Sequence, residues 1–166
     1  SYAVIALIAG HGLVAFRDPY GIRPLSMGRS AEGAVVFASE SVAIEGTGHE
    51  FQRDVAPGEA LFVDLAGNLS AQQCAETTQH FPCVFEYVYL ARPDSVLDGI
   101  SVYQARLNLG ASLAQRVVST VPPSALDVII PIPESSRPSA TQLAHLLGVP
   151  YREGFVKNRY VGRTFI

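Results

Sequence analysis

Asp127-Val128-Ile129-Ile130-Pro131-Ile132-Pro133 is the stretch that decides the fold of this chain. A continuous apolar run of this kind is typical of a strand buried on both faces of a parallel sheet. The helix predicted after it has apolar residues at the spacing i, i+3, i+4, i+7, namely Ala140, Leu143, Ala144 and Leu147. Gly148 followed by Pro150 predicts the end of that helix, and residues 149–156 predict the next strand. The order strand, helix, strand predicts the start of an α/β domain.

The N-terminal part predicts a different architecture. Residues 1 to about 70 contain short apolar runs separated by turn residues, which indicates antiparallel strands joined by tight turns. Strands are expected at 1–9, 13–16, 34–38 and 60–64, the first of them in the core. Ala66-Gly67-Asn68 predicts a hairpin. Ser39-Glu40-Ser41 predicts the cap of a short helix over 42–44.

Between these two parts lies an aromatic segment. Residues 84–90 predict a strand or extended connector, in which Phe85, Tyr87 and Tyr89 alternate and face one side. Core packing is the ordinary role of such a set. Ser101 then predicts the cap of a helix that ends before Pro122-Pro123. The apolar face expected for this helix consists of Val102, Ala105, Leu109 and Leu113.

Composition narrows the class of protein. The chain has 166 residues, 48% of them hydrophobic and only 16% charged, so it can bury a sizeable core. Its net charge of -3 argues against a nucleic-acid-binding domain, which usually carries a basic excess. No apolar run approaches the roughly 18 residues of a membrane span. The two cysteines form no disulfide framework, and we expect a cytoplasmic chain with free thiols.

The loop Pro133-Glu134-Ser135-Ser136 is the first candidate site. It is predicted at the carboxyl end of the apolar strand and at the N-terminus of the next helix, where open α/β sheets bind ligands and where the helix dipole favours anions. Ser135 or Ser136 is also interpretable as an ordinary N-cap, and the two roles can coexist.

The second candidate site is the closing run, residues 155–166. It holds the only lysine, Lys157, together with Arg159 and Arg163, and no acid follows Glu153. Cations gathered in this way on an acidic chain indicate a loop that closes over phosphate or carboxylate. The two sites together predict a phosphorylated substrate and Mg²⁺, which is commonly shared between a few protein oxygens and phosphates.

Other polar residues carry weaker signals. The four histidines have no metal-ligand spacing, and structural or surface roles are expected for His11, His49, His80 and His145. Cys74 and Cys83 lie nine residues apart, which is not a zinc pattern.

Several of these motifs resemble those of the amidophosphoribosyltransferase (glutamine phosphoribosylpyrophosphate amidotransferase) family, and the resemblance runs from end to end. The residues that carry it are Phe16-Arg17-Asp18-Pro19-Tyr20-Gly21-Ile22-Arg23-Pro24-Leu25, Ala38-Ser39-Glu40-Ser41, Arg53-Asp54-Val55-Ala56-Pro57-Gly58-Glu59, Phe85-Glu86-Tyr87-Val88-Tyr89, Ala91-Arg92-Pro93-Asp94-Ser95 and the closing run. Asparagine synthetases carry a turn similar to the first block, so the closing run is the distinguishing motif.

The resemblance implies a mixed α+β and α/β chain. Residues 1–75 would be the later part of an N-terminal-nucleophile glutaminase sandwich with antiparallel strands, and 76–100 an interdomain connector. Residues 101–166 would be the start of a type I phosphoribosyltransferase domain, a parallel sheet with helices. The implied reaction forms 5-phosphoribosylamine from phosphoribosyl pyrophosphate (PRPP) and glutamine-derived ammonia, the first committed step of purine synthesis.

The resemblance also assigns residues by position. Glu134, Ser135 and Ser136 would contact the pyrophosphate, with Ser135 contributing to the Mg²⁺ site, and Lys157, Arg159 and Arg163 would neutralise phosphate. Tyr89, Phe165 and Ile166 match positions that line an ammonia channel. Cys83 matches the first ligand of an iron–sulfur cluster in some family members. Its further ligands would follow Ile166, and we expect a reduced thiol that is not a ligand.

Parts of the family pattern are missing from the chain. The nucleophilic cysteine, the upstream glutamine-binding residues, and the paired aspartates with their Gly-Thr-rich phosphoribosyl-binding loop are absent. We therefore expect an internal fragment without catalytic residues, inactive alone, from a homo-oligomeric cytoplasmic enzyme regulated by purine nucleotides. Two other functions stay open: a non-catalytic nucleotide-binding regulatory module, and the glutaminase domain of an asparagine-synthetase-like amidotransferase.

Overall fold

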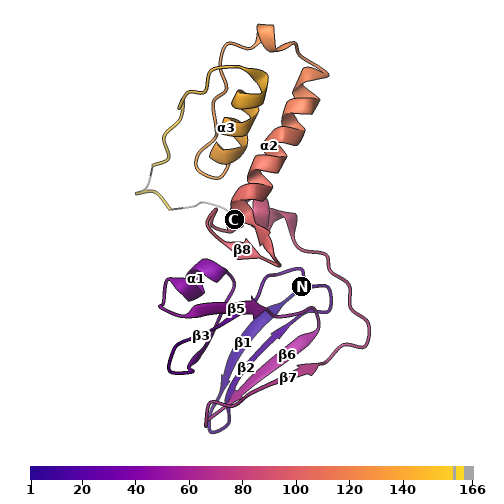
Figure 1. The fold of residues 1–166 in the computed structure, drawn as a ribbon, viewed down its shortest axis with the longest axis vertical. Helices are drawn as coiled ribbons and strands as arrows, with labels where there is room; N and C mark the ends of the chain where they lie inside the picture. The colour runs from indigo at the N-terminus through magenta and orange to yellow at the C-terminus, as the bar shows by residue number, and fades with distance from the viewer. Residues whose placement is uncertain (159, 163–166) are drawn as a thin grey trace. The chain divides into compact units, whose positions relative to one another are not determined.

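The structure, a computed structural model, describes residues 1–158 and 160–162. The chain forms two compact units, Ser1–Val102 and Tyr103–Ile166 (Figure 1). Within the described residues the fold is mixed α/β, and its multi-residue sheets are all antiparallel. None of the described helices combines the length and the apolar character needed to cross a bilayer.

The first unit contains two antiparallel sheets. The larger has the order β1-β2-β6-β7, with bounds Ala3–Ile8, Gly12–Arg17, Glu59–Asp64 and Leu69–Gln73. The smaller has the order β4-β3-β5, with bounds Val35–Ala38, Ser26–Arg29 and Glu50–Asp54. The short helix α1, Ser41–Glu45, packs on the smaller sheet. The hydrophobic core draws residues from both sheets, namely Ala15, Leu25, Met27, Phe37, Val55 and Leu61.

The predicted turns and antiparallel pairing are confirmed, but strand β1 differs from expectation. It pairs with β2 at the edge of the sheet, and it was expected in the core. Because no described strand covers its other side, Leu7 is 81% exposed, and Ile5 and Ile8 are also exposed. The expected cap of α1 is wrong as well. Glu40 occupies the N-cap position without a side-chain cap, and the Ser41 hydroxyl accepts a hydrogen bond from the Val96 amide instead.

The aromatic segment is not a strand. Glu86–Leu90 forms a π-helical turn, η1, in which the Ala91 amide donates to the Glu86 carbonyl at 2.9 Å. Residues i and i+2 do not share a face of a helix, so the expected alternation fails. Tyr87 is buried and donates its hydroxyl hydrogen to the Leu97 carbonyl, whereas Phe85 and Tyr89 are exposed.

A two-residue hairpin closes the first unit. Strands β8, Val96–Leu97, and β9, Ile100–Ser101, are joined by Asp98-Gly99. Both loop residues have positive φ, 50° and 75°, as a type I′ turn requires. The Asp-Gly pair between apolar residues is the signal that could have predicted this hairpin from sequence.

The second unit holds two helices, α2, Val102–Val118, and α3, Arg137–Leu147, with a short 3₁₀ turn, η2, at Pro123–Ala125. The predicted α3 is confirmed: Ala140, Leu143 and Ala144 are buried, and Gly148 ends the helix with a φ of 66°. The predicted α2 exists and Val102 is buried as expected, but the rest of its buried face differs. Arg106, Gly110 and Ala114 are buried, whereas Leu109 and Leu113 are 41% and 47% exposed. Gly110 permits a close approach, since a Cβ there would lie 2.4 Å from the Ser139 carbonyl oxygen of α3.

The stretch 127–133 forms less sheet than its apolar character predicts. Its described pairing is one parallel bridge between Ile129 and Tyr151, supported by hydrogen bonds of 2.8 Å to the Pro150 carbonyl and 3.0 Å from the Arg152 amide. The parallel direction agrees with the prediction. Burial on both faces does not, because Ile130 and Ile132 are 42% and 66% exposed where no described strand covers them.

Candidate functional site

The loop Pro133–Ser136 lies where the sequence places it. It follows the segment with the parallel bridge at Ile129 and leads directly into α3. This is the position at which open α/β sheets bind ligands. The position of the loop therefore suits an anion site, while the ligand itself stays a prediction.

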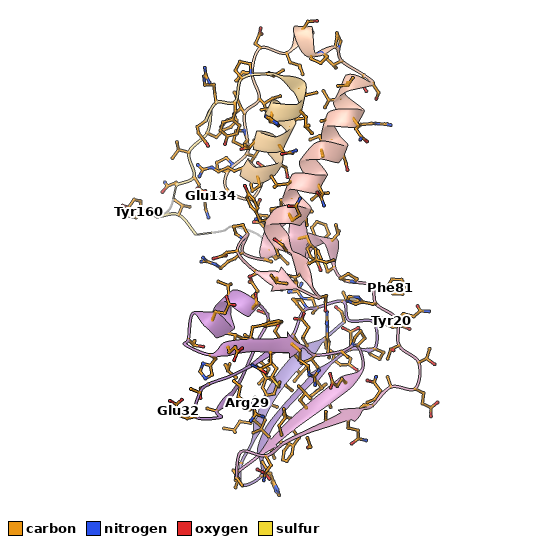
Figure 2. All side chains as sticks on the ribbon, in the orientation of Figure 1. Tyr20, Arg29, Glu32, Phe81, Glu134 and Tyr160 are labelled. Carbon is orange, nitrogen blue, oxygen red and sulfur yellow. The ribbon has the colours of Figure 1, made fainter. Side chains whose placement is uncertain are left out.

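The loop side chains make local contacts. Ser136 stands at the N-cap position of α3 but makes no side-chain cap, because its backbone is already helical (φ −84°, ψ −7°). Its hydroxyl donates to the Ile132 carbonyl instead. The N-cap interpretation is thus wrong for Ser136. Glu134 is partly exposed (Figure 2) and pairs with Arg137, whose Nη1 lies 2.8 Å from Glu134 Oε2.

The closing run is described only in part. Arg159, Arg163, Phe165 and Ile166 lie outside the described residues. Lys157 is exposed, and Tyr160 is 99% exposed. The phosphate and channel roles expected for this run stay predictions.

The cysteines are free thiols. Cys74 is exposed and Cys83 is partly buried. Among the described residues, no group of three or more His, Cys, Asp or Glu side chains could hold a metal ion. The expected role of Tyr89 in a channel is likewise untested; the structure places this residue, 40% exposed, on η1.

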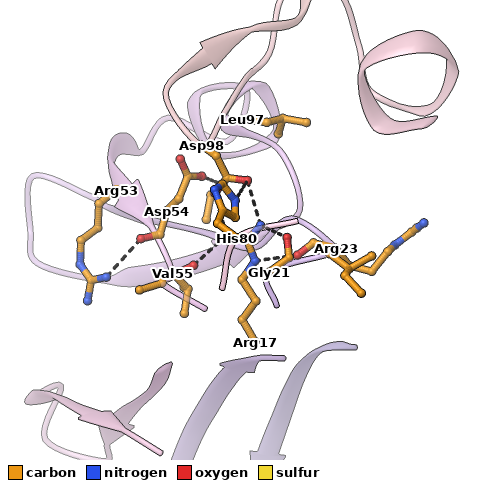
Figure 3. A network of polar contacts seen from close by, with 12 residues as sticks. Arg17, Gly21, Arg23, Arg53, Asp54, Val55, His80, Leu97 and Asp98 are labelled. Atoms are coloured by element: carbon orange, nitrogen blue, oxygen red, sulfur yellow. Dashed lines mark hydrogen bonds and ion pairs between the residues drawn. The ribbon is translucent and has the colours of Figure 1, made fainter. Parts of the chain in front are cut away.

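A buried polar cluster around Arg17 was not predicted from sequence (Figure 3). Only 1% of the Arg17 side chain is exposed. Its Nε donates to the Arg23 carbonyl at 2.7 Å, and its two terminal nitrogens donate to the Val55 and Gly21 carbonyls at 2.9 and 2.8 Å. The same two nitrogens donate to both Asp98 carboxylate oxygens, at 2.7 and 2.9 Å. All five guanidinium N–H groups thus have acceptors, which is the condition for burying this charge.

The cluster shifts the pKa values of two carboxyl groups in opposite directions. Burial raises the pKa of Asp98, but the hydrogen bonds and charge of Arg17, with a smaller effect of His80, outweigh burial and lower it. His80 Nε2 lies 3.1 Å from Asp98 Oδ2. Burial raises the pKa of Asp54, and its hydrogen bond from Ser26 only partly offsets this. The hydrogen bonds of the cluster connect a turn to a hairpin, and we assign the cluster a structural role.

A second polar feature of the first unit is a cavity of about 460 Å³ whose lining includes Arg23, Glu40 and Glu86. Glu86 is buried, and its Oε1 lies 3.1 Å from Arg23 Nη1 without meeting hydrogen-bond geometry. Burial raises the pKa of Glu86, the Arg23 charge opposes the rise, and Glu40 adds to it. Glu40 accepts hydrogen bonds from the Arg92 amide and the Ser95 hydroxyl, at 2.8 and 2.7 Å.

Comparison with solved structures defines the class. The chain matches a glutamine PRPP amidotransferase from B. subtilis, complexed with ADP and GMP, with a TM-score of 0.84 and 40% identity over 99% of this chain. It matches a structure described as the allosteric regulatory enzyme of purine biosynthesis with a TM-score of 0.82 and 42% identity over 94% of this chain. These matches cover 34% and 32% of the solved chains.

Curated relatives give the same result. The chain is 54% identical over its whole length to the amidophosphoribosyltransferase of Haemophilus influenzae, and 48% identical over 99% of its length to that of Saccharomyces cerevisiae. It spans about a third of each relative, 34% in both cases. No family model matches. The chain is thus homologous to one third of an amidophosphoribosyltransferase, and the resemblance stated from its motifs is confirmed.

Proposed function

We propose that the protein carrying this chain is an amidophosphoribosyltransferase, which forms 5-phosphoribosylamine from PRPP and ammonia released from glutamine. The observation that carries the proposal is the loop Pro133–Ser136 at the start of α3, on a chain that matches amidophosphoribosyltransferases over its full length. The chain alone lacks a catalytic residue in this proposal, because the nucleophile and the phosphoribosyl-binding loop belong to parts outside it.

The proposal includes a division of labour along the chain. Residues 1–75 belong to an N-terminal-nucleophile glutaminase sandwich, 76–100 to the connector, and 101–166 to the start of a type I phosphoribosyltransferase domain. Two antiparallel sheets with a shared core in the first unit support the first assignment. A parallel bridge followed by a ligand-type loop and a helix supports the last.

The loop residues Glu134, Ser135 and Ser136 contact pyrophosphate in this proposal, and Lys157, Arg159 and Arg163 neutralise phosphate as the closing run folds over it. A diphosphate needs several donors and cations, and the amide groups at the start of α3 add to these side chains. Tyr89, Phe165 and Ile166 line an apolar path for ammonia. Cys83 remains a thiol outside any iron–sulfur cluster.

Mg²⁺ suits this donor set. It prefers oxygen ligands in octahedral geometry and commonly takes most of them from phosphates and water. The hydroxyl of Ser135 would supply one protein oxygen, and the phosphates of the substrate and water would supply the others. When bound, Mg²⁺ would neutralise the leaving pyrophosphate.

Further partners follow from the same site. A loop that binds the phosphates of PRPP can also bind the phosphate of a nucleotide, so purine nucleotides are proposed as ligands of the complete protein. The solved relative that is complexed with ADP and GMP supports this choice. A cytoplasmic homo-oligomer completes the proposal.

Turnover of PRPP by the full-length protein tests the proposed function. We expect pyrophosphate release that needs PRPP, Mg²⁺ and either glutamine or ammonia. Ser135→Ala should weaken this activity about tenfold or more, because even the loss of a residue that only orients a metal ligand typically costs roughly 10–100-fold. Pyrophosphate release that does not depend on an ammonia source would reject the transferase reaction.

A further inference from the structure

Arg137 lies between two carboxylates beside the loop Pro133–Ser136. Its Nη1 is 2.8 Å from Glu134 Oε2, and its Nη2 is 3.3 Å from Glu153 Oε2. Glu153 is held from its other oxygen as well, because the Tyr151 hydroxyl donates to Glu153 Oε1 at 2.6 Å. One guanidinium group thus connects the loop to the segment that follows the parallel bridge (Figure 2 labels Glu134).

The three charges are partly exposed, between 41% and 43% for each side chain. Ion pairs of this exposure contribute little to folding. A contribution to stability therefore does not account for the arrangement. The three charged side chains lie beside the loop at the start of α3, and this position suggests a role at the loop.

This inference rests on the proposed function, in which PRPP brings several negative charges to the loop. Glu134 contacts the pyrophosphate through its main chain in that function, whereas its carboxylate and that of Glu153 would repel these charges. Arg137 neutralises both with one side chain and keeps Glu134 turned toward α3. Its Nε is buried and has no hydrogen-bond partner among the described residues, so the side chain is fixed by its two terminal nitrogens.

We propose that Arg137 is a positioning residue for PRPP binding, which cancels the charge of Glu134 and Glu153 and holds the loop against the Tyr151–Glu153 segment. It acts through the two glutamates and does not contact the substrate. Lysine carries the same charge but cannot bridge two carboxylates with a planar fork, so Arg137→Lys should recover only part of the effect.

The test is steady-state kinetics of ammonia-dependent PRPP turnover in the full-length protein. Arg137→Ala should raise KM for PRPP about tenfold, as the repulsion from two unneutralised carboxylates at close range predicts, and leave kcat within about twofold. The increase in KM should shrink as salt is added, because screening weakens charge repulsion. Thermal unfolding of the same variants provides the structural control.

Removal of one repelling charge is the matched control. In the double variant Arg137→Ala/Glu153→Gln, KM should return at least halfway toward the wild-type value, whereas Glu153→Gln alone should change KM by less than about twofold. The inference is overturned if Arg137→Ala leaves KM unchanged, if the second substitution restores nothing, or if kcat falls while KM stays constant. If the unmodified protein neither binds nor turns over PRPP, the proposed function itself fails, and this inference fails with it.

Discussion

Arg17 and Asp98, 81 positions apart in the chain, are joined by two hydrogen bonds of 2.7 and 2.9 Å between guanidinium and carboxylate. The pair connects the end of β2 to the turn of the β8–β9 hairpin (Figure 3). Asp98 accepts both bonds from a backbone in the left-handed region, at a φ of 50°, in the Asp98-Gly99 turn. The buried ion pair thus includes a residue whose backbone conformation is uncommon outside glycine.

Asp98→Asn should destabilise the full-length protein. The substitution keeps the shape of the side chain and its tolerance of positive φ, but leaves the buried Arg17 charge unpaired, which costs about 3 kcal/mol. Urea unfolding monitored by circular dichroism measures the difference in the free energy of unfolding.

A matched control uses a surface pair of the same chemistry. Arg92 and Asp94 lie 2.8 Å apart, with side chains 66% and 50% exposed. Asp94→Asn should therefore cost less than about 1 kcal/mol. Equal losses for Asp94→Asn and Asp98→Asn would show that burial of the Arg17 pair has no energetic consequence.

The same pair predicts a pH dependence of stability. The pKa of Asp98 is below its ordinary value of 3.8, so its stabilising contribution is complete above pH 3.8 and is lost as the pH falls through the lowered pKa. Asp98→Asn should therefore weaken the decrease of the unfolding free energy at acid pH. The contribution of Asp54 to this pH dependence has the opposite sign, because the pKa of Asp54 is raised. Asp54→Asn should therefore make the decrease at acid pH steeper. Unfolding free energies measured from about pH 2 to pH 7 test both slopes.

A side chain introduced at Gly28 should overpack the space around it. A Cβ there would lie 2.1 Å from Ile44 Cγ2 of α1 and 2.8 Å from the Glu50 carbonyl oxygen. Gly28→Ala should therefore cost about 1–3 kcal/mol by overpacking. Ile44→Ala in the same protein removes the nearest atom, so the two substitutions together should cost less than the sum of their separate effects. Strict additivity in thermal unfolding would contradict this contact.

We expect Cys83 to be a reduced thiol that holds no iron. The thiol lies in the segment before η1, where it is partly buried. Cys83→Ser in the full-length protein should leave iron content, visible absorption and PRPP turnover unchanged. Loss of iron in this variant would assign Cys83 as a cluster ligand.

The sequence predicted elements best where local chemistry decides them. The turn at Ala66-Gly67-Asn68 and the end of α3 at Gly148 depend on glycine backbone geometry, and both are confirmed. Aromatic residues at alternate positions predicted a strand or extended connector over 84–90, and this failed because the same spacing is compatible with a π-helical turn in which Tyr87 packs inward.

Interactions between distant residues were beyond the reach of local patterns. Arg17 and Asp98 each belong to a recognisable motif, but nothing near either residue indicates its partner. The loop Pro133–Ser136 was located correctly because a strand end and a helix start are both local signals. The bridge from Arg137 to Glu153 was missed because its two residues are 16 positions apart.

Titration of the full-length protein with PRPP, with and without Mg²⁺, tests the proposed function most directly. Isothermal calorimetry should show PRPP binding that requires Mg²⁺ and weakens by about tenfold when Ser135 is replaced by alanine. Purine nucleotide binding that is independent of the metal, together with no binding of PRPP, would contradict the transferase function and favour a regulatory nucleotide-binding module.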